Sequence, residues 1–143
     1  MSSEQIIASL KELVATSENP GKVLTDPADL DNYGKDWTKI YPPKPLAIVL
    51  PKTTEQVQAL VKFANDNQVA LVPSGGRTGL SAGAVAANGE VVVAFDNMNQ
   101  ILDFNASDRT VRCQAGVVTE QLQTFAEENG LYYPVDFASA GSS

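Results

Sequence analysis

Apolar residues recur at helical spacing in three stretches of the chain. Residues 4–16 carry the first apolar stripe, which a Pro-Gly turn ends. Thr53 and Gln56 have the spacing of a capping box, which predicts that a second helix begins there. Thr119 is the expected N-cap of a third helix, which an Asn-Gly pair ends. The predicted apolar face of the second helix consists of Val57, Leu60, Val61 and Ala64.

Continuous apolar runs predict the strands. The run 46–50 ends at a proline, and the run 69–72 follows the second helix. Because a helix joins these two runs, we expect them to lie parallel in a β-α-β unit. A further strand is expected at residues 90–95, and residues 101–104 and 110–115 are expected to pair as a hairpin. Helices and strands mix without strict alternation, which favours an α+β fold over a doubly wound sheet.

The chain has 143 residues, about the size of one domain. Residues 26–45 are rich in proline, aspartate and aromatic residues, which predicts an extended segment across the surface. Together with the first helix, this segment forms a predicted N-terminal region, residues 1–45. The lobe that contains the β-α-β unit is predicted to span residues 46–143.

Charge and composition argue against several classes of protein. The net charge is −7 and no basic run occurs, which argues against nucleic-acid binding. No apolar stretch is long enough to span a membrane, and residues 1–10 lack a signal-peptide pattern. Cys113 is the single cysteine, which fits the reducing cytoplasm, and its alternating neighbours predict a small buried side chain. The absence of histidine excludes a histidine base or histidine metal site within these residues.

The most informative segment is the glycine loop, residues 73–85, which contains four glycines and no acidic residue. Glycine lets a ligand approach the backbone closely, and consecutive N–H groups with nearby hydroxyls form an anion site. A diphosphate is the expected occupant, and an ordinary surface loop is the alternative. The spacing matches neither Gly-x-Gly-x-x-Gly nor the Gly-Lys-Ser/Thr ending of a Walker A loop.

Several segments together carry a resemblance to a known family. The glycine loop, residues 91–93 and Ala115-Gly116-Val117 resemble the FAD-binding domain of the vanillyl-alcohol-oxidase/PCMH superfamily. Residues 33–37 and 132–136 are similar to its FAD-linked D-2-hydroxyacid dehydrogenases, which include D-lactate dehydrogenase, D-2-hydroxyglutarate dehydrogenase and the glycolate oxidase FAD subunit. The resemblance implies that the lobe is the N-terminal, incomplete part of a PCMH-type FAD-binding domain.

The resemblance also implies a set of residues around a non-covalently bound FAD. The backbone that would wrap the diphosphate belongs to Ser74, Gly75, Gly76, Arg77, Thr78, Gly79 and Leu80. The other implied cofactor-binding residues are Pro73 at the loop entry, Gly83 and Ala84 near the ribityl chain, Gly116 and Val117, and a second segment with Pro134, Ala140, Gly141, Ser142 and Ser143. No position matches the catalytic residues or metal ligands of the family, so none is carried over.

An oxidoreductase follows from the same resemblance. Its substrate would be a D-2-hydroxy acid of the D-lactate, glycolate or D-2-hydroxyglutarate type, bound by a domain outside this chain and converted to the 2-oxo acid. We expect this part alone to be inactive and to tend to associate, with a homo-oligomer left open. Two alternatives stay open: a non-catalytic module that binds a phosphorylated ligand or a protein, and an FAD-dependent alcohol or sugar-lactone oxidase.

Some residues have two interpretations at this point. Arg77 either neutralises the diphosphate, or caps a carbonyl or pairs with a carboxylate. Thr78 and Ser81 donate either to phosphate or to their own backbone. Tyr33 and Trp37 either contact adenine or pack on their own domain.

Overall fold

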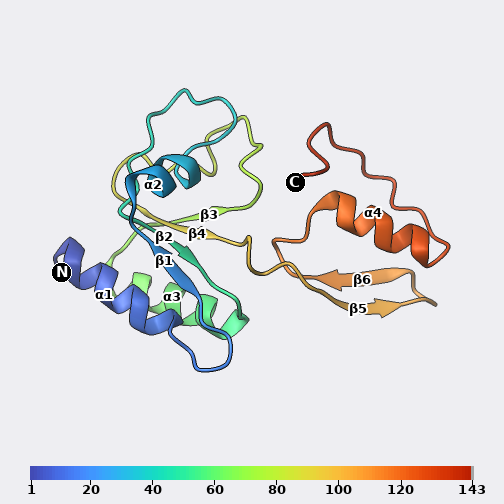
Figure 1. Cartoon of the computed structure of the whole chain (residues 1–143), viewed down its shortest axis with the longest axis horizontal. Helices are drawn as coiled ribbons and strands as arrows, with labels where there is room; N and C mark the ends of the chain where they lie inside the picture. Colours follow the sequence, from blue (N-terminus) through green and yellow to red (C-terminus); the bar gives the residue numbers. More distant parts are fainter. Residues whose placement is uncertain (143) are drawn as a thin grey trace.

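A four-stranded mixed sheet forms the centre of the protein, and a computed structural model describes residues 1–142 (Figure 1). The strands are β1 (Lys22–Leu24), β2 (Ala47–Leu50), β3 (Leu71–Ser74) and β4 (Val91–Ala94), in the order β1-β2-β4-β3. β1 is antiparallel to β2, whereas β2, β4 and β3 are parallel. The predicted parallel relation of β2 and β3 is therefore confirmed, with β4 inserted between them.

Helices cover both faces of the sheet. The helices α1 (Ser3–Val14) and α3 (Thr54–Asn67) lie on one face and α2 (Pro27–Tyr33) lies on the other (Figure 1). Successive strand residues point to opposite faces, so Val49 packs with α1 and α3 while Ile48 packs toward α2. All four residues of β2 and of β4 are buried, as expected for strands covered on both sides.

A hairpin and a helix form the remainder. The strands β5 (Ile101–Asn105) and β6 (Thr110–Cys113) pair antiparallel, which confirms the predicted hairpin. Helix α4 (Thr119–Glu128) packs on the hairpin through an edge-to-face contact between Phe104 and Phe125, whose ring centroids are 5.4 Å apart. The chain then returns toward the sheet, as Figure 1 shows in red. The mixed α+β architecture agrees with the prediction.

The prediction that the segment 26–45 is extended is wrong for part of its length. Its first part forms α2, which Pro27 begins and whose Leu30 and Tyr33 pack on the sheet. The strand β1 was also missed, because a three-residue edge strand gives almost no pattern. The domain division at residue 45 stays a prediction.

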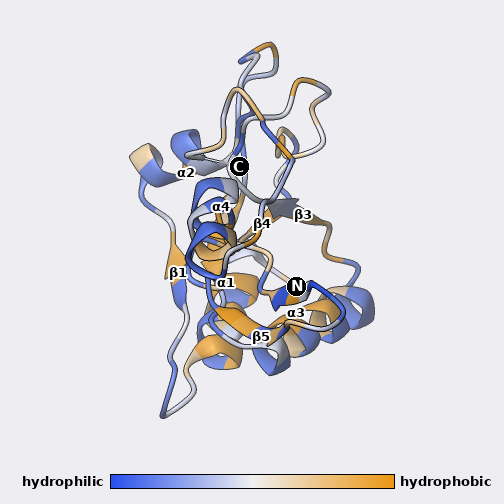
Figure 2. Ribbon diagram, turned by 90° about the vertical axis from the view of Figure 1, so that its right-hand side faces the viewer, coloured by the Kyte–Doolittle hydropathy of each residue, from blue (hydrophilic) through white to orange (hydrophobic). Residues whose placement is uncertain are grey.

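Three local expectations fail. Val61 was predicted to lie on the buried face of α3, but it is 54% exposed. Gln56 is buried on this helix together with Leu60 and Ala64. Thr119 is the first helical residue of α4 rather than its cap, since Val118 is the N-cap residue. Cys113 is exposed. The capping box of Thr53 and Gln56 is confirmed, and Figure 2 shows polar and apolar residues on different parts of α3.

Within residues 1–142, no helix has both the length and the hydropathy that a membrane crossing requires. Ser143, one of the implied cofactor-lining residues, lies outside the described residues.

Candidate functional site

The glycine loop leaves the sheet at the carboxyl end of β3. Ser74 is fully buried there and its carbonyl accepts a hydrogen bond from the N–H of Phe95, so the loop starts from a rigid point. Two non-glycine residues of the loop, Arg77 and Ala82, have positive φ angles of 58° and 62°. A left-handed residue within a turn directs successive N–H groups to one side, which forms an anion-binding concavity.

Most N–H groups of the glycine loop have no protein acceptor. Among the described residues, the backbone N–H groups without one are those of Gly75, Gly76, Arg77, Gly79, Leu80, Ser81, Gly83 and Ala84. A Cβ atom added to Gly75, Gly79 or Gly83 would meet nothing within 4 Å, and none of these glycines has a positive φ. The protein's own packing therefore does not require glycine at these positions, whereas close approach by a ligand would.

Two cavities adjoin the loop. The first, of about 340 Å³, lies between the loop and the start of α4, and the second, of about 470 Å³, lies between the loop and the C-terminal segment. Of the predicted residues, the first cavity is lined by Gly75, Gly76, Arg77, Gly116, Val117 and Ser142, and the second by Thr78, Leu80 and Ser142. Residues far apart in sequence thus meet around one loop.

The other predicted residues line neither of these cavities. They are Pro73, Ser74, Gly79, Gly83, Ala84, Pro134, Ala140 and Gly141. Ala140 instead accepts a hydrogen bond from the N–H of Glu120 at 3.1 Å, so it holds the C-terminal segment to α4. Sequence reasoning missed the cavity residues Phe95, Asp96, Asn99, Val118 and Gln121. Asp96 directly follows a predicted strand, and that position was the only available signal.

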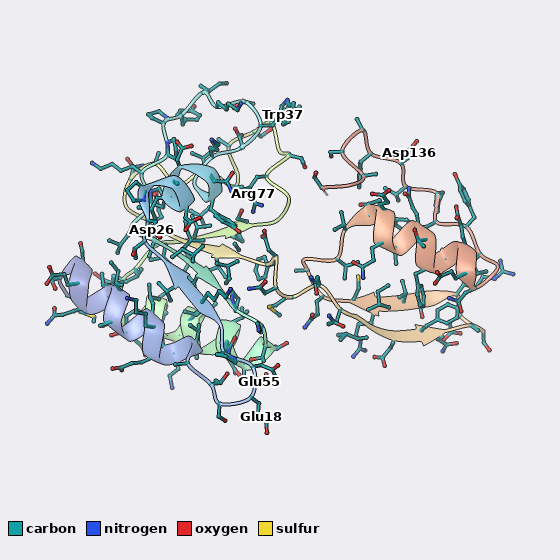
Figure 3. The ribbon with its side chains drawn as sticks, viewed as in Figure 1. Glu18, Asp26, Trp37, Glu55, Arg77 and Asp136 are labelled. Carbon is teal, nitrogen blue, oxygen red and sulfur yellow. The ribbon has the colours of Figure 1, made fainter. Side chains whose placement is uncertain are left out.

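The Arg77 side chain caps a carbonyl and pairs with a carboxylate. Its Nη1 donates to the carbonyl of Gly75 at 2.9 Å, and both terminal nitrogens lie 3.3 Å from the Asp96 carboxylate. The guanidinium also stacks on the Tyr33 ring, 4.5 Å from its centroid. Burial, and then the charge of Asp96, raise the pKa of Tyr33. In Figure 3, Arg77 lies at the end of β3, between α2 and α4.

Asp36 ties a neighbouring segment to the loop. This carboxylate is 3% exposed and accepts from the N–H of Ala82 at 3.0 Å and from the Thr38 hydroxyl at 2.7 Å. Two backbone hydrogen bonds join the same two segments. The N–H of Trp37 donates to the carbonyl of Gly79, and the N–H of Ala86 donates to the carbonyl of Gly34. The bond from Thr38 is the main reason that the pKa of Asp36 is held below its ordinary value of 3.8.

This shift predicts a pH dependence of stability. A carboxyl whose pKa is lower when folded stabilises the protein above its unfolded pKa and loses that contribution as the pH falls through its folded pKa. We expect urea unfolding to show a constant difference between wild type and Asp36→Asn from about pH 7 to 5, and a shrinking one below about pH 4. A difference that persists undiminished at about pH 3 would contradict the assignment.

Comparison with known proteins identifies the family. A family model described as FAD binding domain matches residues 45–143. The chain belongs to the FAD-binding domain family. It is 68% identical over its whole length to the D-2-hydroxyglutarate dehydrogenase of Stutzerimonas stutzeri (strain A1501), 30% of which it covers. It is 35% identical, over 97% of its length, to the D-lactate dehydrogenase of Anaerostipes hadrus, 29% of which it covers. The chain thus spans about 30% of these relatives.

A solved structure shares the fold of this FAD-binding domain. p-Cresol methylhydroxylase superposes with a TM-score of 0.73 at 24% identity, over 97% of this chain and 27% of that one. The predicted PCMH-type fold and the predicted cofactor, FAD, are both confirmed. The residues fit this cofactor: free N–H groups suit a diphosphate, and amide and carboxylate side chains of the first cavity suit its hydroxyl and ring polar atoms.

Proposed function

We propose that this chain is the FAD-binding portion of a flavin-dependent oxidoreductase that converts a D-2-hydroxy acid to the 2-oxo acid. The names of the relatives support this class of substrate, and the 68% identical relative favours D-2-hydroxyglutarate. As part of the proposal the protein works in the cytoplasm, where a single free cysteine stays reduced. Because the chain spans about 30% of these relatives, the activity is assigned to the full-length protein.

The observation that carries the proposal is the set of free N–H groups on the glycine loop beside a cavity. In this proposal the backbone of Gly75, Gly76 and Arg77 binds the diphosphate, and Asn99 and Gln121 orient the cofactor from the opposite wall. FAD supplies the oxidising chemistry when bound, while the protein supplies binding and orientation. Because Arg77 forms an ion pair with Asp96, backbone N–H groups rather than the guanidinium make most of the contacts with the diphosphate in this proposal.

The visible absorption spectrum of the full-length protein is the direct test. A flavin spectrum, with free FAD released by heating, is expected for a non-covalent flavoprotein. Bleaching of that spectrum by D-2-hydroxyglutarate, and more weakly or not at all by D-lactate and glycolate, is expected for the proposed substrate. A protein that stays colourless after FAD is added would contradict the proposal and favour a binding module.

A charge placed in the loop tests the position of the diphosphate. Gly76→Glu in the full-length protein is expected to weaken FAD binding about a hundredfold, because its carboxylate would face the diphosphate. Ser107→Glu adds the same charge at an exposed turn of the hairpin and is expected to bind FAD normally. Dissociation constants from flavin fluorescence quenching give the comparison, and equal affinities would show that the diphosphate binds elsewhere.

A further inference from the structure

The glycine loop holds two residues in a conformation that their side chains disfavour. Arg77 and Ala82 have φ angles of 58° and 62°, a left-handed region that glycine enters freely and other residues rarely enter. Such residues persist where the surrounding structure fixes them, and they occur often at ligand sites. These two strained positions lie on either side of the free N–H groups of Gly79, Leu80 and Ser81.

A carboxylate from another segment fixes Arg77. Both oxygens of Asp96, just beyond β4, lie 3.3 Å from the terminal nitrogens of Arg77. The same guanidinium donates to the carbonyl of Gly75, so it closes the first turn of the loop on itself. Tyr33 stacks on the guanidinium, and its hydroxyl lies 3.4 Å from Asp96.

A second carboxylate fixes Ala82. Asp36 accepts the hydrogen bond of the Ala82 N–H with one oxygen, and its other oxygen is held by the N–H and the hydroxyl of Thr38. Asp36 is buried, so water competes little for these bonds. In Figure 1 the segment that carries Asp36 runs beside the glycine loop above the sheet.

We propose that Asp36 and Asp96 are positioning residues that hold the glycine loop ready to receive the diphosphate of FAD, an inference that rests on the proposed function. The free N–H groups make no bonds of their own, so the two carboxylate contacts fix their direction, together with the hydrogen bond that the Gly79 carbonyl accepts from the N–H of Trp37. A loop already in its bound conformation avoids the ordering cost of binding. Arg77 then acts as an anchor for the backbone rather than as the cation that binds the diphosphate.

A pair of substitutions at Arg77 separates these two roles. Both Arg77→Ala and Arg77→Gly remove the same charge and the same contacts, but only glycine takes the left-handed conformation without an anchor. In the full-length apoprotein, Arg77→Ala is expected to bind FAD about tenfold more weakly than wild type, and Arg77→Gly to recover most of that loss. Equal losses in both variants would assign the effect to charge and overturn the anchor role.

Asp36 is tested by rescue. Asp36→Ala is expected to weaken FAD binding about tenfold, and Ala82→Gly in the same protein to restore most of the affinity. Ala82→Gly alone is the control and is expected to change affinity less than threefold. An Asp36→Ala loss that glycine does not restore would show that Asp36 supports the fold without setting the loop.

The same titrations keep the inference separate from the proposed function. If Gly76→Glu weakens FAD binding about a hundredfold while Asp36→Ala and Asp96→Asn bind as wild type, the diphosphate site stands and the positioning role is overturned. If Gly76→Glu binds FAD normally, the proposed function of the loop fails.

Discussion

Replacing Gly116 by alanine is expected to destabilise the protein by about 3 kcal/mol, the upper end of the usual cost of overpacking. A Cβ atom at this position would overlap the carbonyl oxygen of Phe95 and lie 2.9 Å from that of Met98. Both obstacles are backbone atoms of the turn after β4, and Gly116 itself donates to the carbonyl of Met98 at 2.8 Å. The turn must therefore shift before any side chain fits.

In the proposed function, FAD binding depends on the same turn after β4. Gly116 lines the first cavity, so a shifted turn would displace Asp96 and Asn99 together and weaken FAD binding as well. Thermal unfolding of the apoprotein measures the stability effect. Gly79→Ala is the matched control, because its Cβ would meet nothing within 4 Å, and a change of less than about 1 kcal/mol is expected. Similar melting temperatures for the two variants would contradict the steric argument.

Elements with a repeated apolar pattern could be predicted from the sequence, whereas short elements could not. β2 and β4 are buried on both faces and appear as continuous apolar runs, and α3 carries a complete capping box. β1 has three residues and α2 has seven, too few for either periodicity to emerge. β1 exists because it pairs with β2 at the edge of the sheet, and α2 exists because it packs on the sheet; a local pattern encodes neither contact.

Only part of the candidate site could likewise be predicted from the sequence. Glycine spacing identified the loop, but the partners of the loop depend on tertiary structure. Asp36 lies 46 residues before Ala82 and Asp96 lies 19 residues after Arg77, and no local rule connects either pair. The order of strands also mattered, since β4 lies beside β3 and so places Asp96 next to the start of the loop. A contact between neighbouring strand ends follows only once that order is known.

Gln56 shows why a polar residue can occupy a core position. Its amide is 1% exposed and makes hydrogen bonds in two directions. The oxygen accepts from the N–H groups of Lys52 and Thr53, which caps α3. The nitrogen donates to the carbonyls of Val14 and Asn19, which fastens the end of α1 to the same point. A buried amide satisfied on both sides stabilises the fold, and an unsatisfied one would cost more than it contributes.

Gln56→Ala is accordingly expected to lower the free energy of unfolding by about 3 kcal/mol, because the buried carbonyls and N–H groups lose their partner at once. Gln58→Ala removes the same side chain from the exposed face of the same helix and should change stability by less than about 0.5 kcal/mol. Gln56→Glu keeps the acceptor that caps α3 but places a buried carboxylate oxygen against the carbonyls of Val14 and Asn19, so a loss at least as large as that of Gln56→Ala is expected in urea unfolding at about pH 7. A loss in Gln56→Glu as small as that of Gln58→Ala would contradict the role of the donor bonds to the carbonyls of Val14 and Asn19.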